Sequence, residues 1–203
     1  MAQPAIVVDG RGGLPDEICR QLRLAGAVRV HGGAYAADAA ESLLAHGPRE
    51  LPAAVILVGS RTVAVEATTP WHRAGVLHLP VTCDGRVAVV GPLVVPGSGA
   101  CWRCHALTSH DLDAIGAPCT GHAALDQVTL PSGSLGVLTA AVTATVVLAA
   151  VAGASRLAGV STEIEVEGPS VVHRHWSRHP LCTDCPPGVA PSWPHRSQDT
   201  MAG

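Results

Sequence analysis

Residues 5–26 read AIVVDGRGGLPDEICRQLRLAG, and this stretch decides the fold class. Residues 5–8 form a short apolar run that predicts a buried strand. A glycine cluster follows at Gly10, Gly12 and Gly13, and an amphipathic run then predicts a helix. A buried strand that passes through glycines into a helix is typical of nucleotide-binding α/β domains, where a phosphate lies on the helix N-terminus.

The glycine cluster departs from the nucleotide-binding pattern G-x-G-x-x-G. Gly10 and Gly12 match the first two glycines, but Pro15 stands in place of the third. The next expected strand runs into His31-Gly32-Gly33, without the acidic residue that would hold a ribose. Gly10, Gly12 and Gly13 are therefore a degenerate candidate nucleotide loop. The alternative is a glycine-rich turn that binds no ligand.

The rest of the chain alternates apolar strand patterns with helical patterns, which predicts a mostly parallel, Rossmann-like sheet flanked by helices. A turn at Asp84-Gly85 predicts a late antiparallel hairpin. The further strands are expected at 28–30, 53–60, 76–81, 87–95, 162–168 and 170–176, and the further helices at 36–47, 69–75 and 135–154. We expect one domain over 1–185 and a disordered Pro/Ser/His-rich tail over 186–203.

Composition excludes several classes of protein. The net charge is −3, all 13 basic residues are arginine, and there is no basic run, so we expect no nucleic-acid partner. The N-terminus lacks the charged region of a signal peptide, which favours a cytoplasmic protein. Residues 135–154 are long enough to span a bilayer, but their many Ala, Gly and Thr residues and the lack of flanking aromatic or basic anchors favour a buried helix.

We do not expect the seven cysteines to form a disulfide framework, because the count is odd and no secretion signal is present. Four of them make two CxxC pairs, CWRC at 101–104 and CTDC at 182–185. Paired CxxC units in such a chain indicate metal binding. The alternatives are two unrelated pairs or a redox dithiol.

The order of these patterns resembles the ThiF-like branch of the ubiquitin-activating-enzyme superfamily. The most specific part is VGPLVVPG at 90–97 running into CWRC, followed by the long Gly/Ala-rich helix and the terminal CTDC. The chain is most similar to the members that act with YcaO-type cyclodehydratases on peptides that acquire thiazole and oxazole rings. This resemblance implies a Rossmann-like fold, homodimers, and one structural zinc on Cys101, Cys104, Cys182 and Cys185. Four thiolates fill the tetrahedral coordination shell of a zinc ion, which leaves no open position for a catalytic water or a substrate.

Active members of that superfamily adenylate a carboxyl terminus with ATP, using a phosphate-binding lysine and acids for the ribose and Mg²⁺. This chain contains no lysine, lacks the ribose acid, and has no acid at the end of the strand over 53–60. ATP binding is therefore not expected, and the resemblance implies a pseudoenzyme. The first strand begins at residue 5, so we expect no leader-peptide-binding module before it.

The roles of the remaining cysteines and of a histidine cluster are considered next. Cys119, close to His122, is either a thioester-forming residue or an incidental thiol. Cys19 is expected in the core and Cys83 in a turn. Three interpretations remain open for the cluster His173, His175 and His179: a second metal site, a solvated strand end, and a contact surface for an acidic peptide.

Three functions follow from these observations. The first is a non-catalytic scaffold that supports a YcaO-type cyclodehydratase and binds a precursor peptide or a separate leader-binding protein. The second is an ATP-dependent adenylyltransferase acting on a peptide or sulfur-carrier C-terminus. The third is a stand-alone, zinc-stabilised dimerisation module. The helix over 135–154, with small residues such as Ala144, is expected at or beside a homodimer interface.

Overall fold

The structure is a computed structural model and describes residues 5–42, 51–114 and 133–185. Its strands are β1 (Ile6–Asp9), β2 (Val30–Gly33), β3 (Ala54–Gly59), β4 (Leu77–Cys83), β5 (Val87–Val90), β6 (Val160–Glu165) and β7 (Ser170–His175). Its helices are α1 (Gly13–Leu24), α2 (Ala36–Glu41), α3 (Val65–Arg73), α4 (Trp102–Ala114) and α5 (Gly133–Val151), with a 3-10 turn, η3, at Ser155–Leu157.

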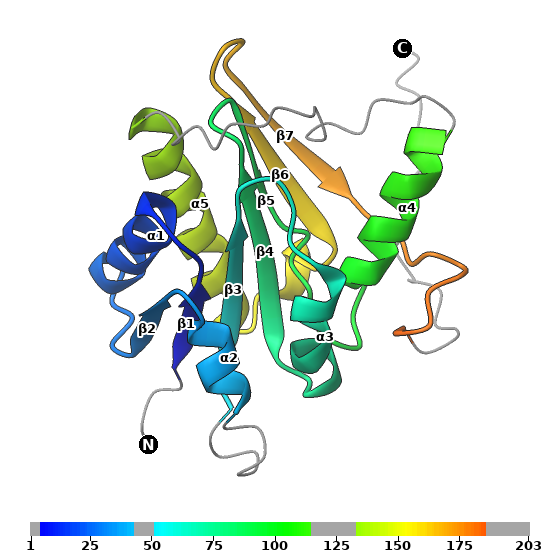
Figure 1. Ribbon diagram of the computed structural model, residues 1–203, viewed down its shortest axis with the longest axis horizontal. Coiled ribbons are helices and arrows are strands. Elements are labelled where there is room, and N and C mark those ends of the chain that lie inside the picture. The colour runs from blue at the N-terminus through cyan, green and yellow to red at the C-terminus, as the bar shows by residue number, and fades with distance from the viewer. Residues whose placement is uncertain (1–4, 43–50, 115–132, 186–203) are drawn as a thin grey trace, which may run out of the picture.

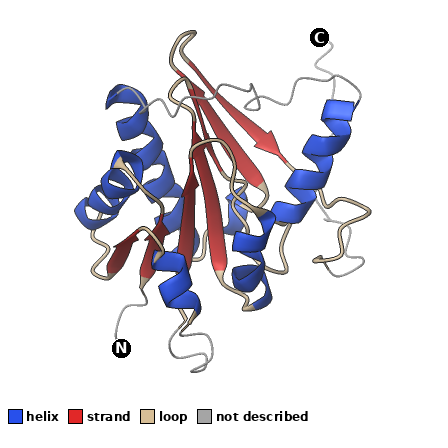
Figure 2. Cartoon of the chain, viewed as in Figure 1, coloured by secondary structure: helices blue, strands red, loops and turns tan. Residues whose placement is uncertain are grey.

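The strands form one sheet in the order β2-β1-β3-β4-β5-β6-β7 (Figures 1 and 2). Strands β1 to β4 pair in parallel, and β5, β6 and β7 then pair antiparallel with the strand before them. Since β6 returns to the direction of β4, most strands point the same way. The expected fold class, a mostly parallel sheet with a late antiparallel hairpin, is confirmed.

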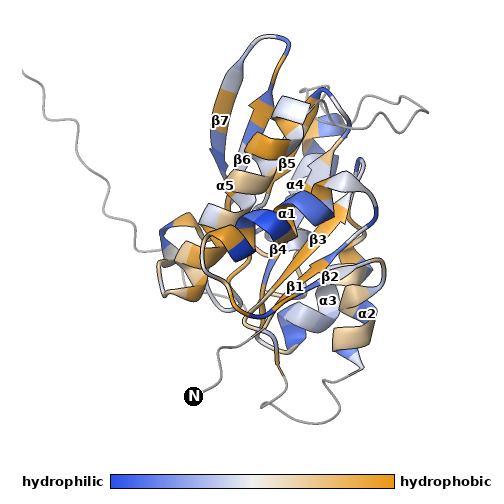
Figure 3. Cartoon of the chain, turned by 90° about the vertical axis from the view of Figure 1, so that its left-hand side faces the viewer, coloured by the Kyte–Doolittle hydropathy of each residue, from blue (hydrophilic) through white to orange (hydrophobic). Residues whose placement is uncertain are grey.

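Helices cover both faces of the sheet (Figure 1). On one face, α1 and α5 bury Ile18, Leu22, Leu135 and Val147 against strand residues such as Leu79. On the other face, a second apolar cluster joins the strands to α2, α3 and the start of α4. Figure 3 shows the amphipathic character of α1, whose outer side is hydrophilic above hydrophobic central strands. This arrangement makes a three-layer α/β domain.

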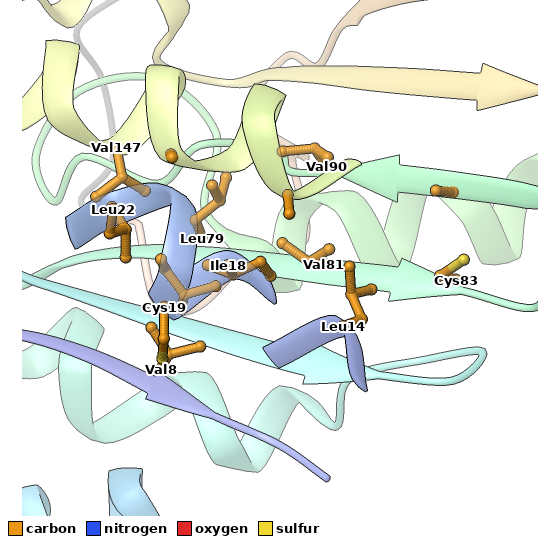
Figure 4. Packing of buried hydrophobic residues seen from close by; sticks show 14 of the residues in the cluster. Val8, Leu14, Ile18, Cys19, Leu22, Leu79, Val81, Cys83, Val90 and Val147 are labelled. Carbon is orange, nitrogen blue, oxygen red and sulfur yellow. The ribbon is translucent and has the colours of Figure 1, made fainter. Parts of the chain in front are cut away.

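Cys19 and Cys83, two of the three cysteines outside the CxxC pairs, both lie in the first of these clusters (Figure 4). Cys19 is buried on α1, as expected, and a Cβ added to Gly32 would lie 2.4 Å from its Sγ. Cys83 was expected in a turn, and this prediction is wrong. It is the last residue of β4 and is buried, because the strand continues two residues beyond the predicted end at 81 before Asp84 begins the turn.

Further element boundaries differ from the sequence prediction. The strand expected at 28–30 begins at Val30, since Val30 is the residue that pairs with Ile6 of β1, and Val28 is exposed. Helix α2 begins at the expected Ala36 but ends at Glu41, and residues 43–50 lie outside the described part.

Helix α3 begins at Val65, four residues before the expected start, and contains Pro70. Proline removes one backbone donor from this turn. The hydroxyls of Thr68 and Thr69 donate to the Val65 carbonyl at 2.8 and 3.0 Å, which adds side-chain hydrogen bonds to the first turn of the helix. Pro70 is the sixth of the nine residues of α3, so it lies inside the helix and does not open it.

The expected turn at Asp84-Gly85 is confirmed, and the Asp84 carboxylate accepts hydrogen bonds from the backbone N–H groups of Arg86 and Val87 at 2.9 Å. The following strand is shorter than predicted and ends at Val90. Gly91 then adopts a φ of +104°, and a Cβ there would lie 2.8 Å from the Val160 carbonyl. The chain then continues to α4, a helix that the sequence analysis did not predict.

Helix α5 is the long apolar helix of the sequence analysis. It is long and apolar enough to cross a membrane, with a mean hydropathy of 2.1, and 44% of its most apolar window is buried inside the protein. Its inner side packs on the sheet and α1. Its outer side exposes Val137, Leu138 and Val151.

Candidate metal centre and adjoining pocket

The four cysteines of the two CxxC pairs lie together. Cys101 directly precedes α4 and Cys104 lies in its first turn, while Cys182 and Cys185 lie in the segment after β7. The Sγ atoms are separated by 3.7 Å for Cys101–Cys104, 3.5 Å for Cys101–Cys182 and 3.5 Å for Cys104–Cys185. All four Sγ atoms fall within 4.8 Å of one another. The chain therefore has one four-cysteine cluster that could bind a metal such as zinc.

The geometry fits a tetrahedral ion. Zinc–sulfur bonds of about 2.3 Å place neighbouring sulfurs of a tetrahedron about 3.8 Å apart. The observed separations of 3.5–3.7 Å are close to this value. Zinc would take all four thiolates and have no open position for water or substrate, so it would supply structure and no bond-making chemistry.

The cluster favours a thiolate even before a cation binds. A hydrogen bond from the Cys101 thiol lowers the pKa of Cys104 to about 4 and raises the pKa of Cys101. Burial raises the pKa of Cys185 to about 11. These shifts favour a thiolate at Cys104 and thiols at Cys101 and Cys185, and a divalent cation would displace the protons of those thiols.

Two further contacts hold the CTDC turn against the helices. The Arg103 Nε donates to the Asp184 carboxylate at 2.7 Å, which links a residue between Cys101 and Cys104 to the residue before Cys185. The His72 ring lies with Nε2 2.9 Å from the Asp184 carbonyl oxygen. A carbonyl only accepts, so Nε2 of His72 carries the proton, and the turn is fixed to α3 as well as α4.

Hydrogen bonds at Trp176, Arg178, His179 and Asp184 join the segment that carries the last two candidate ligands to the rest of the protein. None of the residues 176–185 is fully buried. Fixing one backbone residue costs about 1–2 kcal/mol, so ordering this stretch costs on the order of 10–20 kcal/mol. Each net hydrogen bond returns only about 0.5–1.5 kcal/mol, and an exposed ion pair about 0–1 kcal/mol. A tetrathiolate zinc, worth about 10–16 kcal/mol in small peptides, would be the largest single contribution to the order of this segment.

A pocket of about 350 Å³ adjoins the cluster, between the loop after β3, helix α4 and strands β4 to β7. Three rings form one wall of the pocket. Trp102 stacks on His105 with ring centroids 4.4 Å apart, and His105 meets Trp176 edge-on at 4.2 Å. The charged residues Arg61, Asp113, Glu163 and Arg174 lie around it, and Arg174 donates to Glu163 at 3.1 Å.

The indole groups of this wall are held by hydrogen bonds. Trp102 Nε1 donates to the Val63 carbonyl at 3.0 Å, and Trp176 Nε1 donates to the Ser161 hydroxyl at 2.8 Å. The sequence analysis did not single out these rings. One signal was available, since Trp102 stands inside the CWRC motif, but nothing in the sequence placed Trp176 beside it.

The glycine loop lies at the carboxyl end of β1, as a nucleotide loop would. Gly10 has a φ of +150°, and a Cβ there would lie 2.9 Å from both Pro15 Cγ and Val58 Cβ. Gly12 has a φ of +95° and, like Gly13, has open space where a Cβ would lie. Glycine is thus required at Gly10 for close packing, with or without a ligand.

The neighbouring strand end carries no acid. Beyond Gly33, Tyr35 adopts a φ of +66°, and its ring lies 5.0 Å from the Arg11 guanidinium carbon. The Asp9 carboxylate accepts a hydrogen bond from the backbone N–H of Ala37 at 3.2 Å, at the start of α2. An arginine–tyrosine contact therefore lies near the end of β2, the position at which dinucleotide-binding folds carry the ribose-binding acid.

The histidine cluster does not converge on one point. His173 Nδ1 lies 3.0 Å from the Thr162 hydroxyl, and His179 Nε2 donates to the Asp111 carboxylate at 2.9 Å. Within residues 5–42, 51–114 and 133–185, only the four cysteines form a metal-ligand group. A second metal site at these histidines is therefore not supported. Cys119 and His122 lie outside the described residues.

No family model and no curated protein match the sequence. Solved structures match the fold. MccB of E. coli, crystallised with AMPCPP and MccA, is 15% identical with a TM-score of 0.61 over 90% of this chain. A heterocyclase in complex with substrate and cofactor is 14% identical with a TM-score of 0.62, and the heterocyclase TruD is 19% identical with a TM-score of 0.60, each over 90% of this chain.

The chain spans 66% of the MccB chain and 25% and 27% of the two heterocyclase chains. At this level of identity the likeness defines the fold. The fold expected from the ThiF-like, cyclodehydratase-type resemblance is therefore confirmed.

Proposed function

We propose that this chain is a non-catalytic, ThiF-like scaffold in the maturation of a ribosomally made peptide. It binds a precursor peptide, or a separate leader-binding protein, and presents it to a YcaO-type cyclodehydratase. The observation that carries the proposal is the shared fold with heterocyclases, one of them with substrate bound, and with MccB bound to MccA. The ring-lined pocket beside the cysteines supports it, because an apolar cavity with a few polar groups is the usual form of a binding site.

A structural zinc on Cys101, Cys104, Cys182 and Cys185 is part of this proposal. The sulfur separations and the all-thiolate donor set support zinc, and a role in structure follows from a filled coordination shell. Free thiolate ligands suit a reducing compartment, so we place the protein in the cytoplasm.

The pocket can be tested by filling it. Ala106 of α4 lines the pocket, whereas Ala114 at the other end of the same helix does not. Ala106→Trp should weaken binding of the precursor peptide at least tenfold, measured by isothermal titration, and should lower cyclodehydratase activity in the reconstituted mixture. Ala114→Trp, the matched control, should change neither. Equal binding by both variants and wild type would exclude the pocket as the peptide site.

The second candidate is an adenylyltransferase. The observation that favours it is the retained glycine loop before α1, together with MccB structures that contain AMPCPP or ATP. The missing lysine and ribose acid weigh against it. We expect no rise in melting temperature with millimolar ATP and Mg²⁺, since any ligand of the native state raises it by mass action. A clear shift, or peptide-dependent pyrophosphate exchange, would replace the scaffold proposal with this one.

A homodimer completes the proposal. The outer side of α5 carries exposed Val137, Leu138 and Val151 and no charged residue, and an uncharged apolar surface can cover itself across a two-fold axis. Ala144, considered above at such an interface, faces the core with 3% exposure. The contact would therefore use the side that includes Leu138.

A further inference from the structure

The rings that line the pocket come from the same two segments that carry the cysteines. Trp102 and His105 lie in the first turns of α4, next to Cys101 and Cys104. Trp176 directly follows β7 and begins the segment that reaches Cys182 and Cys185. Figure 1 shows this segment running back beside the start of α4. The pocket wall and the metal ligands are thus two parts of one contact between distant parts of the chain.

Within this contact, Trp176 is the bridging ring. Its ring meets His105, the residue after Cys104, at 4.2 Å, while its backbone N–H donates to the Gly159 carbonyl at 2.8 Å. His105 in turn stacks on Trp102 with an interplanar angle of 7°. A displacement of the segment after β7 therefore moves the edge of the wall, and a displacement of Trp176 moves the segment that carries two ligands.

Residues 176–185 contribute no fully buried side chain, so a metal on Cys182 and Cys185 would be the largest single stabilising contribution to this segment. We infer that the cysteine cluster and the pocket are one linked unit. Metal binding assembles the ring wall, and an occupant of the pocket that packs on the wall strengthens metal binding. Linkage requires the two effects to be equal in size, since both act on the same order–disorder equilibrium. Trp176 and His105 are then positioning residues for the metal centre as well as pocket residues.

Only the identity of the occupant as a peptide rests on the proposed function. The link between the wall and the metal is a property of the chain alone, so it can be tested without any peptide.

The first test follows the rings as zinc is removed from the full chain with a chelator. The indole N–H signals of Trp102 and Trp176 should shift or broaden in ¹H–¹⁵N spectra. The methyl signals of Ile18 and Ile56, in the cluster on the α1 and α5 face, should stay in place. Unchanged indole signals would overturn the inference. Simultaneous loss of all four signals would overturn it too, because the metal would then hold the whole fold.

The second test runs in the opposite direction. Trp176→Ala should lower zinc affinity about tenfold or more, measured by competition with a chromophoric chelator, as outer-shell changes at metal sites do. Trp176→Phe keeps a ring and should recover part of the loss. Val172→Ala on the exposed β7 strand is the control and should bind zinc as wild type does. Wild-type zinc affinity in Trp176→Ala would overturn the link.

These results separate the two proposals. If the rings and zinc are coupled but the precursor peptide does not bind, the linked unit stands and the proposed function fails. If the peptide binds equally to zinc-loaded and zinc-free protein, the proposed function stands and the link fails.

Discussion

Replacement of Cys182 by serine tests the structural role of the metal centre most directly. The variant removes one of the four thiolates and leaves three ligands and a hydroxyl. We expect it to lose zinc and to release residues 176–185 while the sheet and its helices stay folded, because neither core cluster takes a fully buried residue from that segment. The effect should therefore be local.

The magnitude follows from the contribution of the metal. Ordering the ten residues 176–185 costs on the order of 10–20 kcal/mol, and a tetrathiolate zinc contributes about 10–16 kcal/mol in small peptides. Loss of even about 4 kcal/mol of this contribution corresponds to about a thousandfold in the opening equilibrium. The backbone amides of Trp176 and Leu181, which donate to the Gly159 carbonyl and to His179 Nδ1, should lose at least this factor of hydrogen-exchange protection.

The assay combines zinc analysis of the purified protein with amide exchange. Wild type should carry about one zinc per chain, as a single tetrathiolate requires. Cys83→Ala is the matched control, because Cys83 is buried on β4 in the cluster on the other side of the sheet, and it should keep its zinc. A metal-free wild type with protected Trp176 and Leu181 amides would refute the reasoning.

Three further predictions concern the core, the glycine loop and the helix α5. Burial lowers the pKa of His78 to about 4, so as pH falls from about 6.5 towards 4 the unfolded chain binds a proton that the folded chain does not. Unfolding free energy should fall by up to about 3 kcal/mol, and His78→Leu should flatten this loss in urea titrations. Gly10→Ala should cost about 1–3 kcal/mol through contact with Pro15 and Val58, whereas Gly13→Ala, with open space around it, should be near neutral in the same titrations. Leu138→Glu on the exposed side of α5 should convert a dimer to a monomer in sedimentation, whereas Val171→Glu on exposed β7 should not; a monomeric wild type would reject the interface.

Strong local patterns made the parallel half of the fold predictable. The apolar runs at 5–8 and 53–60 predicted buried strands, and their predicted ends lie one residue from the ends of β1 and β3. Boundaries were less predictable where pairing partners decide them. Val30 begins β2 because Ile6 lies opposite, and β5 ends at Val90 because Gly91 packs against the Val160 carbonyl. Such contacts join residues far apart in the chain, and periodicity carries no record of them.

The metal ligands and the pocket show the same division. The sequence by itself determined that the chain has two CxxC pairs, a strand–glycine–helix start and no lysine, because these depend on residue identity and local spacing. Only the tertiary structure decided that the four sulfurs lie within 4.8 Å of one another. It also decided that Trp176 joins Trp102 and His105 in one wall and that the three histidines do not converge. The reason is physical: the path of the chain through β6 and β7 returns the C-terminal segment to α4, and that path is set by the packing of the whole sheet.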